Sequence, residues 1–453
     1  MSLIRKQPFS LQKTIAALLL TFPFVENASA QSSWWNGKTA TGNWGGVRDT
    51  WASHGVAVTG YWEGNYYGVA SGGLHNMGAF DEEFGIKLVL DFAKLTGNSL
   101  LDGLTFESKG RYKNGTNVNN YVGASSAFNP SNIQGGQYWR FRDAFFSYTT
   151  PELFGVKKLL TISGGWQDPY HYFAQQPDSK LFENNSINTS KGLSMSDITW
   201  SGTYAAWGGY IKVQPTDWFY AQFGMYETLI GATATNNNGL NFTRKSSGPE
   251  FIGETGFTPK LGADRLAGKY AFGSIYWNAD NTSFGSEEHH DGRYNIYFQA
   301  DQHLYREPSP EAPAPVSDGK TSKEPVAPAA PPKLTDQGLY LFSFFVFADE
   351  ENNRTPFYFH AGFTYKGLIP QRDDDRLGVG FAYASYSDDK ADAEKAAGKT
   401  IHQEHEALLE ADYRCQINKW LYLQPFVQYI IRPGGTGEIN DALVLGVKSM
   451  ITF

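Results

Sequence analysis

The polar residues that first suggest a function are charged side chains that recur at every second position. Glu107, Lys109 and Arg111 have this spacing within FESKGRYK, and Arg140 and Arg142 repeat it further along the chain. Because successive side chains of a β-strand point to opposite faces, each set lies on one face of its strand. Paired charges of both signs suit a neutral polyol, whose hydroxyl groups both donate and accept hydrogen bonds.

The opposite faces of such segments are apolar. In EEFGIKLVLDFA, Phe84, Ile86 and Leu88 alternate with Glu83 and Lys87. A period of two indicates β-strands in a sheet with one apolar and one polar side. In a soluble sandwich the apolar side forms the core, whereas in a membrane barrel it faces lipid and the polar side lines a lumen. The long charged side chains of the polar face, with aromatic residues near the segment ends, favour the barrel.

Composition argues against several other classes of protein. The 453 residues carry a formal net charge of -8 without a basic stripe, which argues against nucleic-acid binding. The single cysteine, Cys415, excludes an intramolecular disulfide. Beyond the N-terminal region, no segment reaches the about 20 apolar residues that a spanning helix needs, whereas a barrel strand needs only about 10. With 15% aromatic residues and 48 glycines, the chain fits many strands joined by turns.

The first thirty residues have the pattern of a signal peptide. Basic Arg5, Lys6 and Lys13 precede a short apolar run, and small residues ending at Ala30 form a cleavage site. Residues 1–30 carry a net charge of +2, so the chain that remains after cleavage carries -10. Export without disulfides and a barrel pattern together predict a location in the bacterial outer membrane.

The alternating segments number sixteen, and bacterial single-chain barrels have an even number of strands. The fold class expected for residues 56–453 is all-β, a sixteen-stranded antiparallel transmembrane barrel. The predicted strands lie near residues 57–67, 82–93, 103–113, 137–148, 157–166, 202–213, 217–227, 249–258, 268–278, 291–302, 338–348, 356–366, 375–385, 402–414, 419–431 and 441–453.

The connections between these segments alternate in length, as in barrels with short periplasmic turns and longer outer loops. Short connections include 214–217 and 416–419, and long ones include 114–136 and 167–201. The Pro-rich segment 306–333 departs from this rule, because it is long but lies on the side of the short turns. We interpret it as an insertion at a periplasmic turn, or alternatively as a tether to the cell wall or a periplasmic partner.

The last residue of the sequence, Phe453, continues the apolar face of the last predicted strand. A terminal aromatic residue on an amphipathic strand is the feature that the outer-membrane barrel assembly machinery recognises in such barrels. The sequence therefore predicts contact with that machinery, as well as with outer-membrane lipid and lipopolysaccharide.

Several separated motifs resemble the OprB-type carbohydrate-selective porins. They are TGNWGGVRDTWASHGV, GPEFIGETGF, GLIPQRDDDRLGVGFAYASYS and the region LQPFVQYIIRPGG…DALVLGVKSMITF. The similarity extends from about Gly42 to Phe453 and does not include the Pro-rich insertion. It implies a sixteen-stranded outer-membrane barrel that passes glucose and other small sugars by diffusion. It also implies an N-terminal segment that narrows the periplasmic mouth and a constriction built partly from inward loops, for which 167–201 is a candidate; alternatively, that loop caps the outside.

Alternation places a set of charged side chains on the lumen side. We expect Arg111, Arg140, Arg142 and Glu254 to lie near the constriction. Alternatively, these charges only form ion-pair networks that hold the wall of the barrel in shape. The full set of candidates is Glu63, Glu107, Lys109, Arg111, Arg140, Arg142, Glu254, Asp301, Glu406, Glu410, Asp412 and Arg414.

Residues 31–55 precede the first strand and so form a segment at the periplasmic mouth. Within it, GGVRDTWASHG can form about two helical turns bounded by glycines. Val47 and Trp51 share one face, which we expect to pack against the barrel wall, and Arg48 points elsewhere, into the channel. Alternatively, the tryptophans only anchor this segment at the membrane interface.

Other functions compete with a sugar porin. A barrel enzyme needs a nucleophile paired with a histidine, and His402 and His405, three positions apart on a strand, face opposite sides and make a poor metal site. We therefore predict no enzymatic activity, no cofactor and no metal. A general or ion-selective porin stays open, because the acidic excess can favour cations. A soluble carbohydrate-binding sandwich is the third alternative.

Overall fold

The structure, a computed structural model, describes most of the chain beyond the predicted signal peptide. Residues 1–30 and most of the Pro-rich segment 306–333 lie outside the described residues, so the expectations for them stay predictions. No helix within the described residues is long and apolar enough to cross a membrane. The described residues are 34–169, 172–188, 193, 205–229, 238–240, 242, 246–308 and 335–453.

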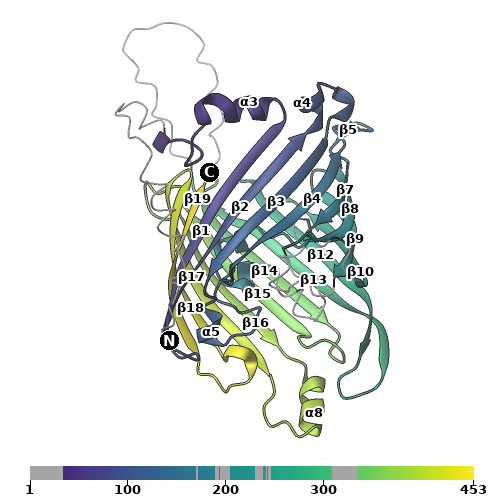
Figure 1. Cartoon of the computed structure of the whole chain (residues 1–453), viewed down its shortest axis with the longest axis vertical. Coiled ribbons are helices and arrows are strands. Elements are labelled where there is room, and N and C mark those ends of the chain that lie inside the picture. The colour runs from purple at the N-terminus through teal and green to yellow at the C-terminus, as the bar shows by residue number, and fades with distance from the viewer. Residues whose placement is uncertain are drawn as a thin grey trace, which may run out of the picture.

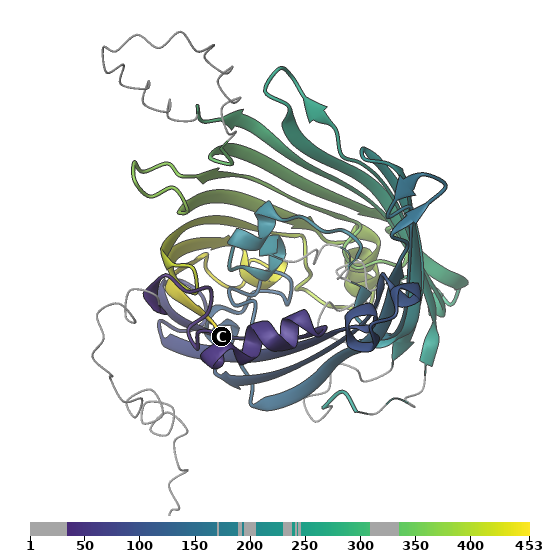
Figure 2. The same ribbon diagram turned by 90° about the horizontal axis from the view of Figure 1, so that it is seen from above.

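Sixteen long strands in this part of the chain form one closed antiparallel barrel (Figures 1 and 2). Each strand pairs with the next, and the last pairs with the first, where Tyr61 lies opposite Thr452. The predicted barrel is confirmed, and each of the sixteen predicted segments overlaps one of these strands. The strands are β1 (Val56–Ser71), β2 (Gly78–Asp91), β3 (Leu104–Gly115), β4 (Tyr138–Thr149), β7 (Leu160–Gln167), β8 (Ala206–Thr216), β9 (Phe219–Leu229), β10 (Ser246–Phe257), β12 (Leu266–Thr282), β13 (His289–Arg306), β14 (Gly338–Ala348), β15 (Phe357–Lys366), β16 (Arg376–Ser385), β17 (His405–Asn418), β18 (Leu421–Ile431) and β19 (Ala442–Thr452).

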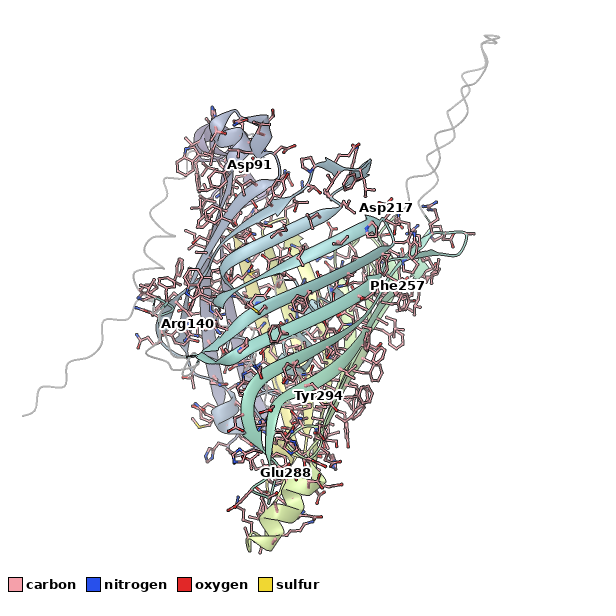
Figure 3. All side chains as sticks on the ribbon, turned by 90° about the vertical axis from the view of Figure 1, so that its right-hand side faces the viewer. Asp91, Arg140, Asp217, Phe257, Glu288 and Tyr294 are labelled. Carbon is pink, nitrogen blue, oxygen red and sulfur yellow. The ribbon has the colours of Figure 1, made fainter. Side chains whose placement is uncertain are left out.

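The two faces of the barrel wall differ as the alternation predicts. On β1, Asn65 and Tyr67 point inward and are buried, whereas Tyr66 between them is 60% exposed on the outside. Phe257 and Tyr294, on two other strands, are likewise exposed on the outer face (Figure 3). The outer face is thus apolar and aromatic, and the polar side chains face the lumen.

Short turns and long loops lie at opposite ends of the barrel (Figure 1). The turn end carries α4 (Phe92–Thr96) and the small hairpin of β5 (Glu152–Leu153) and β6 (Val156–Lys157). The loop end carries α5 (Asn119–Val122) and α8 (Asp388–Ala396). The longest connections, such as 116–137, therefore lie at the loop end as the sequence predicts, with the Pro-rich connection at the turn end as the exception.

The Pro-rich segment leaves the barrel at the turn end. Arg306 pairs with Gly338, and the backbone N–H of Glu307 donates to the carbonyl of Gln337 at 3.1 Å. These contacts close the hairpin of β13 and β14 before the chain enters the segment. An insertion can therefore start here without disturbing the wall.

The N-terminal segment forms α3 (Val47–Ser53), which lies at the turn end of the barrel (Figure 1). It begins after Gly46 and ends before Gly55, and both glycines have a positive φ, as the predicted helix boundaries require. The expected packing of Val47 and Trp51 against the wall is wrong, because these side chains are 43% and 46% exposed. The helix instead follows a segment that is fixed at the rim of the barrel.

Contacts that precede α3 fix the segment at that rim. The backbone N–H of Ala40 donates to the carbonyl of Thr452 at 2.7 Å. The rings of Trp34 and Trp35 pack on Trp420, with centroid distances of 5.0 and 5.8 Å. The two ends of the described chain therefore meet where β1 pairs with β19.

Candidate channel constriction

Residues 172–188 cross the inside of the barrel, where they appear as a teal segment within the ring (Figure 2). At one end of this segment, Glu254 of β10 accepts a hydrogen bond from the backbone N–H of Ala174 at 2.7 Å. The same carboxylate accepts hydrogen bonds from the hydroxyl groups of Tyr220 and Tyr297 at 2.7 and 2.8 Å. Glu254 thus joins the inward loop to β9, β10 and β13.

At its other end the loop is held by a second carboxylate. Glu410 of β17 accepts from the backbone N–H groups of Glu183 and Asn184, at 2.9 and 3.1 Å. The Glu183 side chain in turn accepts from Tyr67 at 2.7 Å and pairs with Lys448 at 3.1 Å. These contacts tie the loop to β17, β1 and β19.

The middle of the loop contacts the far wall. Gln176 donates to the carbonyl of Ser343 at 2.8 Å, and its amide oxygen lies 2.7 Å from Nε2 of His360. The hydroxyl group of Tyr358 donates to the carbonyl of Ser186. The loop is therefore an inward constriction element rather than an outer cap.

A second outer connection, 114–136, also folds inward. Glu406 accepts from the backbone N–H of Ser125 at 3.1 Å, and Asp81 accepts from the hydroxyl group of Ser131 at 2.6 Å. The backbone N–H of Asn185 donates to the carbonyl of Asn129 at 3.1 Å and so joins the two loops. Sequence reasoning treated this connection only as a long loop. The buried side chains of Val118, Val122, Phe128 and Ile133 are the apolar signal that identifies it as packed.

The side of the lumen formed by β2 and β3 stays accessible. Glu107 pairs with Lys87 at 2.6 Å and with Lys109 at 2.7 Å, and its side chain is 18% exposed. The side chains of Lys87 and Lys109 are 39% and 20% exposed. This triad offers an acceptor between two donors to a solute in the lumen.

Arg142 extends this accessible surface onto β4. A register shift opposite Lys109 and Gly110 forms a bulge, which lets Arg142 and Asp143 both contact lumen groups. The Arg142 side chain is 20% exposed and pairs with Asp168 at 2.8 Å. Strict alternation does not predict two adjacent lumen-facing residues.

On the inward loop, the exposed side chain of Lys180 faces Arg142 and Asp168. Desolvation inside the barrel lowers the pKa of Lys180 to about 8; the Arg142 charge acts in the same direction and the Asp168 charge opposes it. The narrow part of the lumen is thus formed by the loop on one side and by β2, β3 and β4 on the other.

The remaining predicted constriction residues are covered. Arg111 is 8% exposed and pairs with Glu83 at 3.2 Å. Arg140 is 2% exposed, with its guanidinium 4.9 Å from the centroid of the Tyr138 ring, and Glu254 is 3% exposed. Of the predicted residues, Glu107, Lys109 and Arg142 are therefore accessible from the lumen, whereas Arg140 and Glu254 are covered.

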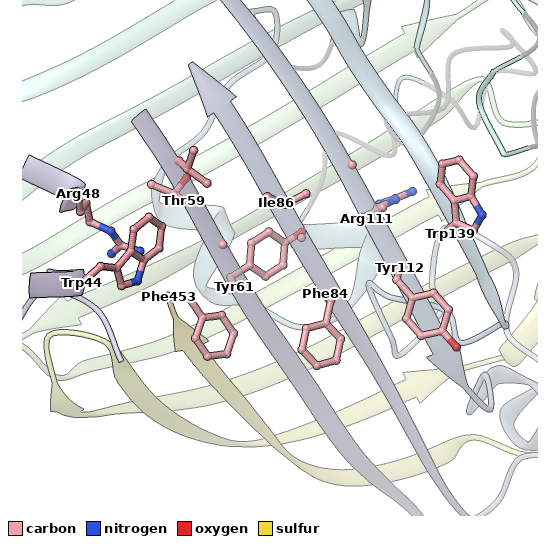
Figure 4. A pocket seen from close by; sticks show the side chains of 14 residues that line it. Trp44, Arg48, Thr59, Tyr61, Phe84, Ile86, Arg111, Tyr112, Trp139 and Phe453 are labelled. Atoms are coloured by element: carbon pink, nitrogen blue, oxygen red, sulfur yellow. The ribbon is translucent and has the colours of Figure 1, made fainter. Parts of the chain in front are cut away.

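Arg48 lies outside the lumen, contrary to the expectation from the sequence. It borders a groove of about 670 Å³ whose other lining includes the outward-facing Phe84, Tyr112 and Phe453 (Figure 4). The guanidinium donates to the Thr39 hydroxyl group at 2.7 Å and lies 4.2 Å from the centroid of the Trp44 ring. These local partners hold Arg48 within the N-terminal segment.

Arg48→Ala is therefore expected to leave single-channel conductance and sugar block of the ion current unchanged, because no lumen charge is lost. Arg142→Ala is the matched comparison, since it removes an accessible lumen guanidinium and should change both quantities. Planar-bilayer recordings of the two purified variants test this difference. A conductance change in Arg48→Ala that matches that in Arg142→Ala would place Arg48 on the ion path.

Comparison with known proteins agrees with this architecture. The family model "Carbohydrate-selective porin, OprB family" matches residues 75–453. The chain belongs to this family. As a porin of the OprB family it resides in the bacterial outer membrane, where its outer face contacts lipid and its lumen admits small sugars. Membership in a porin family makes it a channel protein.

Individual relatives are similar along most of this porin. Porin B of Pseudomonas aeruginosa is 23% identical over 450 residues, which cover 92% of each chain. The putative porin QuiX of Acinetobacter baylyi is 23% identical over 58% of each chain. The high-pH structure of Pseudomonas putida OprB has the same fold, with a TM-score of 0.78 and 22% identity over 92% of this chain and 99% of that one.

Proposed function

We propose that this porin lets glucose and similar small sugars diffuse passively across the outer membrane into the periplasm. The observation that carries the proposal is Glu107, which faces the accessible lumen between Lys87 and Lys109. The carboxylate accepts hydrogen bonds from sugar hydroxyl groups, and the two ammonium groups donate to them. Because the carboxylate is already paired with two cations, a neutral sugar can bind to it without burying an unpaired charge.

Such a site needs to bind weakly, because a solute must also leave it. Arg142 and Lys180 add further donors next to the triad, and we propose that a sugar passes along this line of side chains. We propose no catalytic step for this chain. An assay for lipase and protease activity on the purified protein tests that part of the proposal.

Glu107→Gln is expected to weaken sugar block of the ion current about fivefold. The substitution keeps the size of the side chain but removes a charged acceptor, whose hydrogen bonds each contribute about 1.5–3 kcal/mol, part of which the amide oxygen retains. Planar-bilayer conductance with graded glucose measures the half-blocking concentration. Glu152→Gln, in the exposed hairpin at the turn end, is the control and should behave like the unmodified protein.

A general porin of low specificity is the alternative. Liposome swelling with glucose, a disaccharide and amino acids of similar size separates the two functions. Uptake that depends on solute size alone, with no effect of Glu107→Gln, would favour the general porin and contradict a sugar site.

We also propose two contacts outside the lumen. Phe453 faces the outer surface beside Gly60 at the turn end, where the barrel assembly machinery and then membrane lipid can reach it, whereas lipopolysaccharide would contact the outer face nearer the loop end. The Pro-rich segment 306–333 has a composition suited to an extended insertion at the periplasmic turn and is a candidate contact to the cell wall. Deleting residues 308–332 and measuring co-sedimentation of the porin with the cell envelope tests the cell-wall contact. Unchanged co-sedimentation would contradict it.

A further inference from the structure

The acidic side chains that face the inside of the barrel are almost all covered. Among the described residues, twelve such carboxylates belong to residues that are at most 7% exposed. They are Glu63, Asp81, Glu83, Asp143, Asp168, Glu183, Glu250, Glu254, Asp301, Glu406, Glu410 and Asp412.

These carboxylates are covered because many of them hold the inward loops. Glu254, Glu406 and Glu410 accept hydrogen bonds from backbone N–H groups of the loops, and Asp81 accepts from Ser131 and Gly135. A carboxylate is a strong acceptor for such groups, and this use removes it from the lumen surface. The negative net charge of the whole chain therefore does not give the charge of the lumen surface that a solute contacts.

The basic side chains of the lumen are divided: Arg111, Lys113, Arg140 and Lys448 are covered, whereas others are accessible. Lys87 is 39% exposed and Arg376 is 32% exposed, and Lys180 is exposed on the inward loop. Lys109 and Arg142 are each 20% exposed. Two accessible carboxylates of this region, those of Glu107 and Asp178, are each paired with basic side chains.

Strands further along the ring add two more cations. Lys212 of β8 lies over the Tyr220 ring at 4.4 Å, and Lys269 of β12 donates to the carbonyl of Gln175 at 2.5 Å. Both residues are partly exposed and lie close enough to repel each other. Accessible cations therefore lie on β2, β3, β4, β8 and β12.

We propose that this constriction prefers anionic solutes, so that sugar acids carrying one carboxylate pass at least as readily as neutral sugars, with Lys180 as a selectivity-determining residue. The inference rests on the proposed sugar-porin function and names a substrate class for it. Charges in a narrow pore act on the solute directly, whereas salt screens the acidic outer loops beyond about 8 Å at physiological ionic strength.

The reversal potential of the full-length protein in a KCl gradient tests the proposal directly. The unmodified porin should conduct chloride better than potassium. Lys180→Gln should lower this preference about twofold, the effect of one charge several Å from the ion path in a water-like dielectric. Lys395→Gln, which removes an exposed lysine of α8, is the charge-matched control and should have no effect.

Liposome swelling separates failure of this inference from failure of the proposed function. Glucose and glucuronate differ by one carboxylate at similar size, so the ratio of their rates reports charge preference, whereas glucose alone reports sugar passage. A glucuronate rate well below that of glucose, or a cation preference in the KCl gradient, overturns the inference and leaves sugar diffusion intact. If Lys180→Gln leaves the ratio of the glucuronate and glucose rates unchanged, Lys180 does not determine the charge preference.

The pH dependence gives an additional readout. Lys180 has a pKa of about 8, so raising the pH from 7 to 9 neutralises it, and the preference for anions should fall. The groups that face Lys180 are Arg142, Asp168 and the imidazole of His360, and Arg414 donates to the Lys180 carbonyl at 3.5 Å. Lys180→Gln should show a smaller change over the same pH range. An equal change in both proteins would assign the titration to another group.

Discussion

Glu254→Ala is expected to raise single-channel conductance severalfold and to abolish most sugar block. Glu254 accepts hydrogen bonds from Ala174, Tyr220, Gln222 and Tyr297, so its loss releases one end of the inward loop from the wall. Hydrogen bonds to a charged group contribute about 1.5–3 kcal/mol each. Water in the lumen replaces part of these hydrogen bonds, so we expect the unfolding free energy to fall by about 3 kcal/mol in total.

Planar-bilayer conductance and the temperature of heat-induced unfolding on gels measure the two effects. Glu227→Ala, an exposed outward-facing glutamate on the neighbouring β9, is the matched control for loss of a wall carboxylate. Glu254→Ala combined with Glu410→Ala frees both ends of the loop and should raise conductance further. Unchanged conductance in the double variant would mean that the loop does not limit the pore.

Lys448→Met is expected to have the largest effect on stability. Lys448 is 3% exposed and lies 2.8 Å from Glu63 and 3.1 Å from Glu183, so its removal leaves two covered carboxylates without their cation. Breaking a buried ion pair on one side costs about 3–5 kcal/mol. Heat-induced unfolding should therefore shift to a clearly lower temperature.

A double variant separates the effect of the lost charge from that of the lost packing. In Lys448→Met combined with Glu183→Gln, one of the two uncompensated charges is absent, and part of the lost stability should return. A double variant less stable than Lys448→Met alone would show that packing of the lysine side chain, rather than charge, determines the effect.

The barrel could be predicted from the sequence because its signal is local. One alternating segment specifies one strand, and the length of a connection specifies the end at which it lies. The same rule identified Glu107 and Lys109 as lumen residues, and the structure places both on the accessible side of the lumen. Helix boundaries next to Gly46 and Gly55 were likewise predictable from the residues themselves.

The constriction was less predictable because it depends on contacts between residues distant in sequence. Alternation gives the face of a side chain, but it does not show whether a loop covers that face. Glu254 and Arg140 point inward as expected, yet they are covered, and Arg142 contacts Asp168 through a bulge that breaks the alternation. Arg48 was misplaced because helix periodicity does not predict its contacts with Thr39 and Trp44.

The position of Glu183 links pore size to the order of assembly. Its side chain contacts Tyr67 and Lys448, which belong to the first and last strands, while its backbone is bound by Glu410. Those two strands pair only when the ring closes, so the full set of contacts that positions Glu183 requires the closed barrel. Closure of the wall therefore completes the anchoring of the loop that narrows the passage.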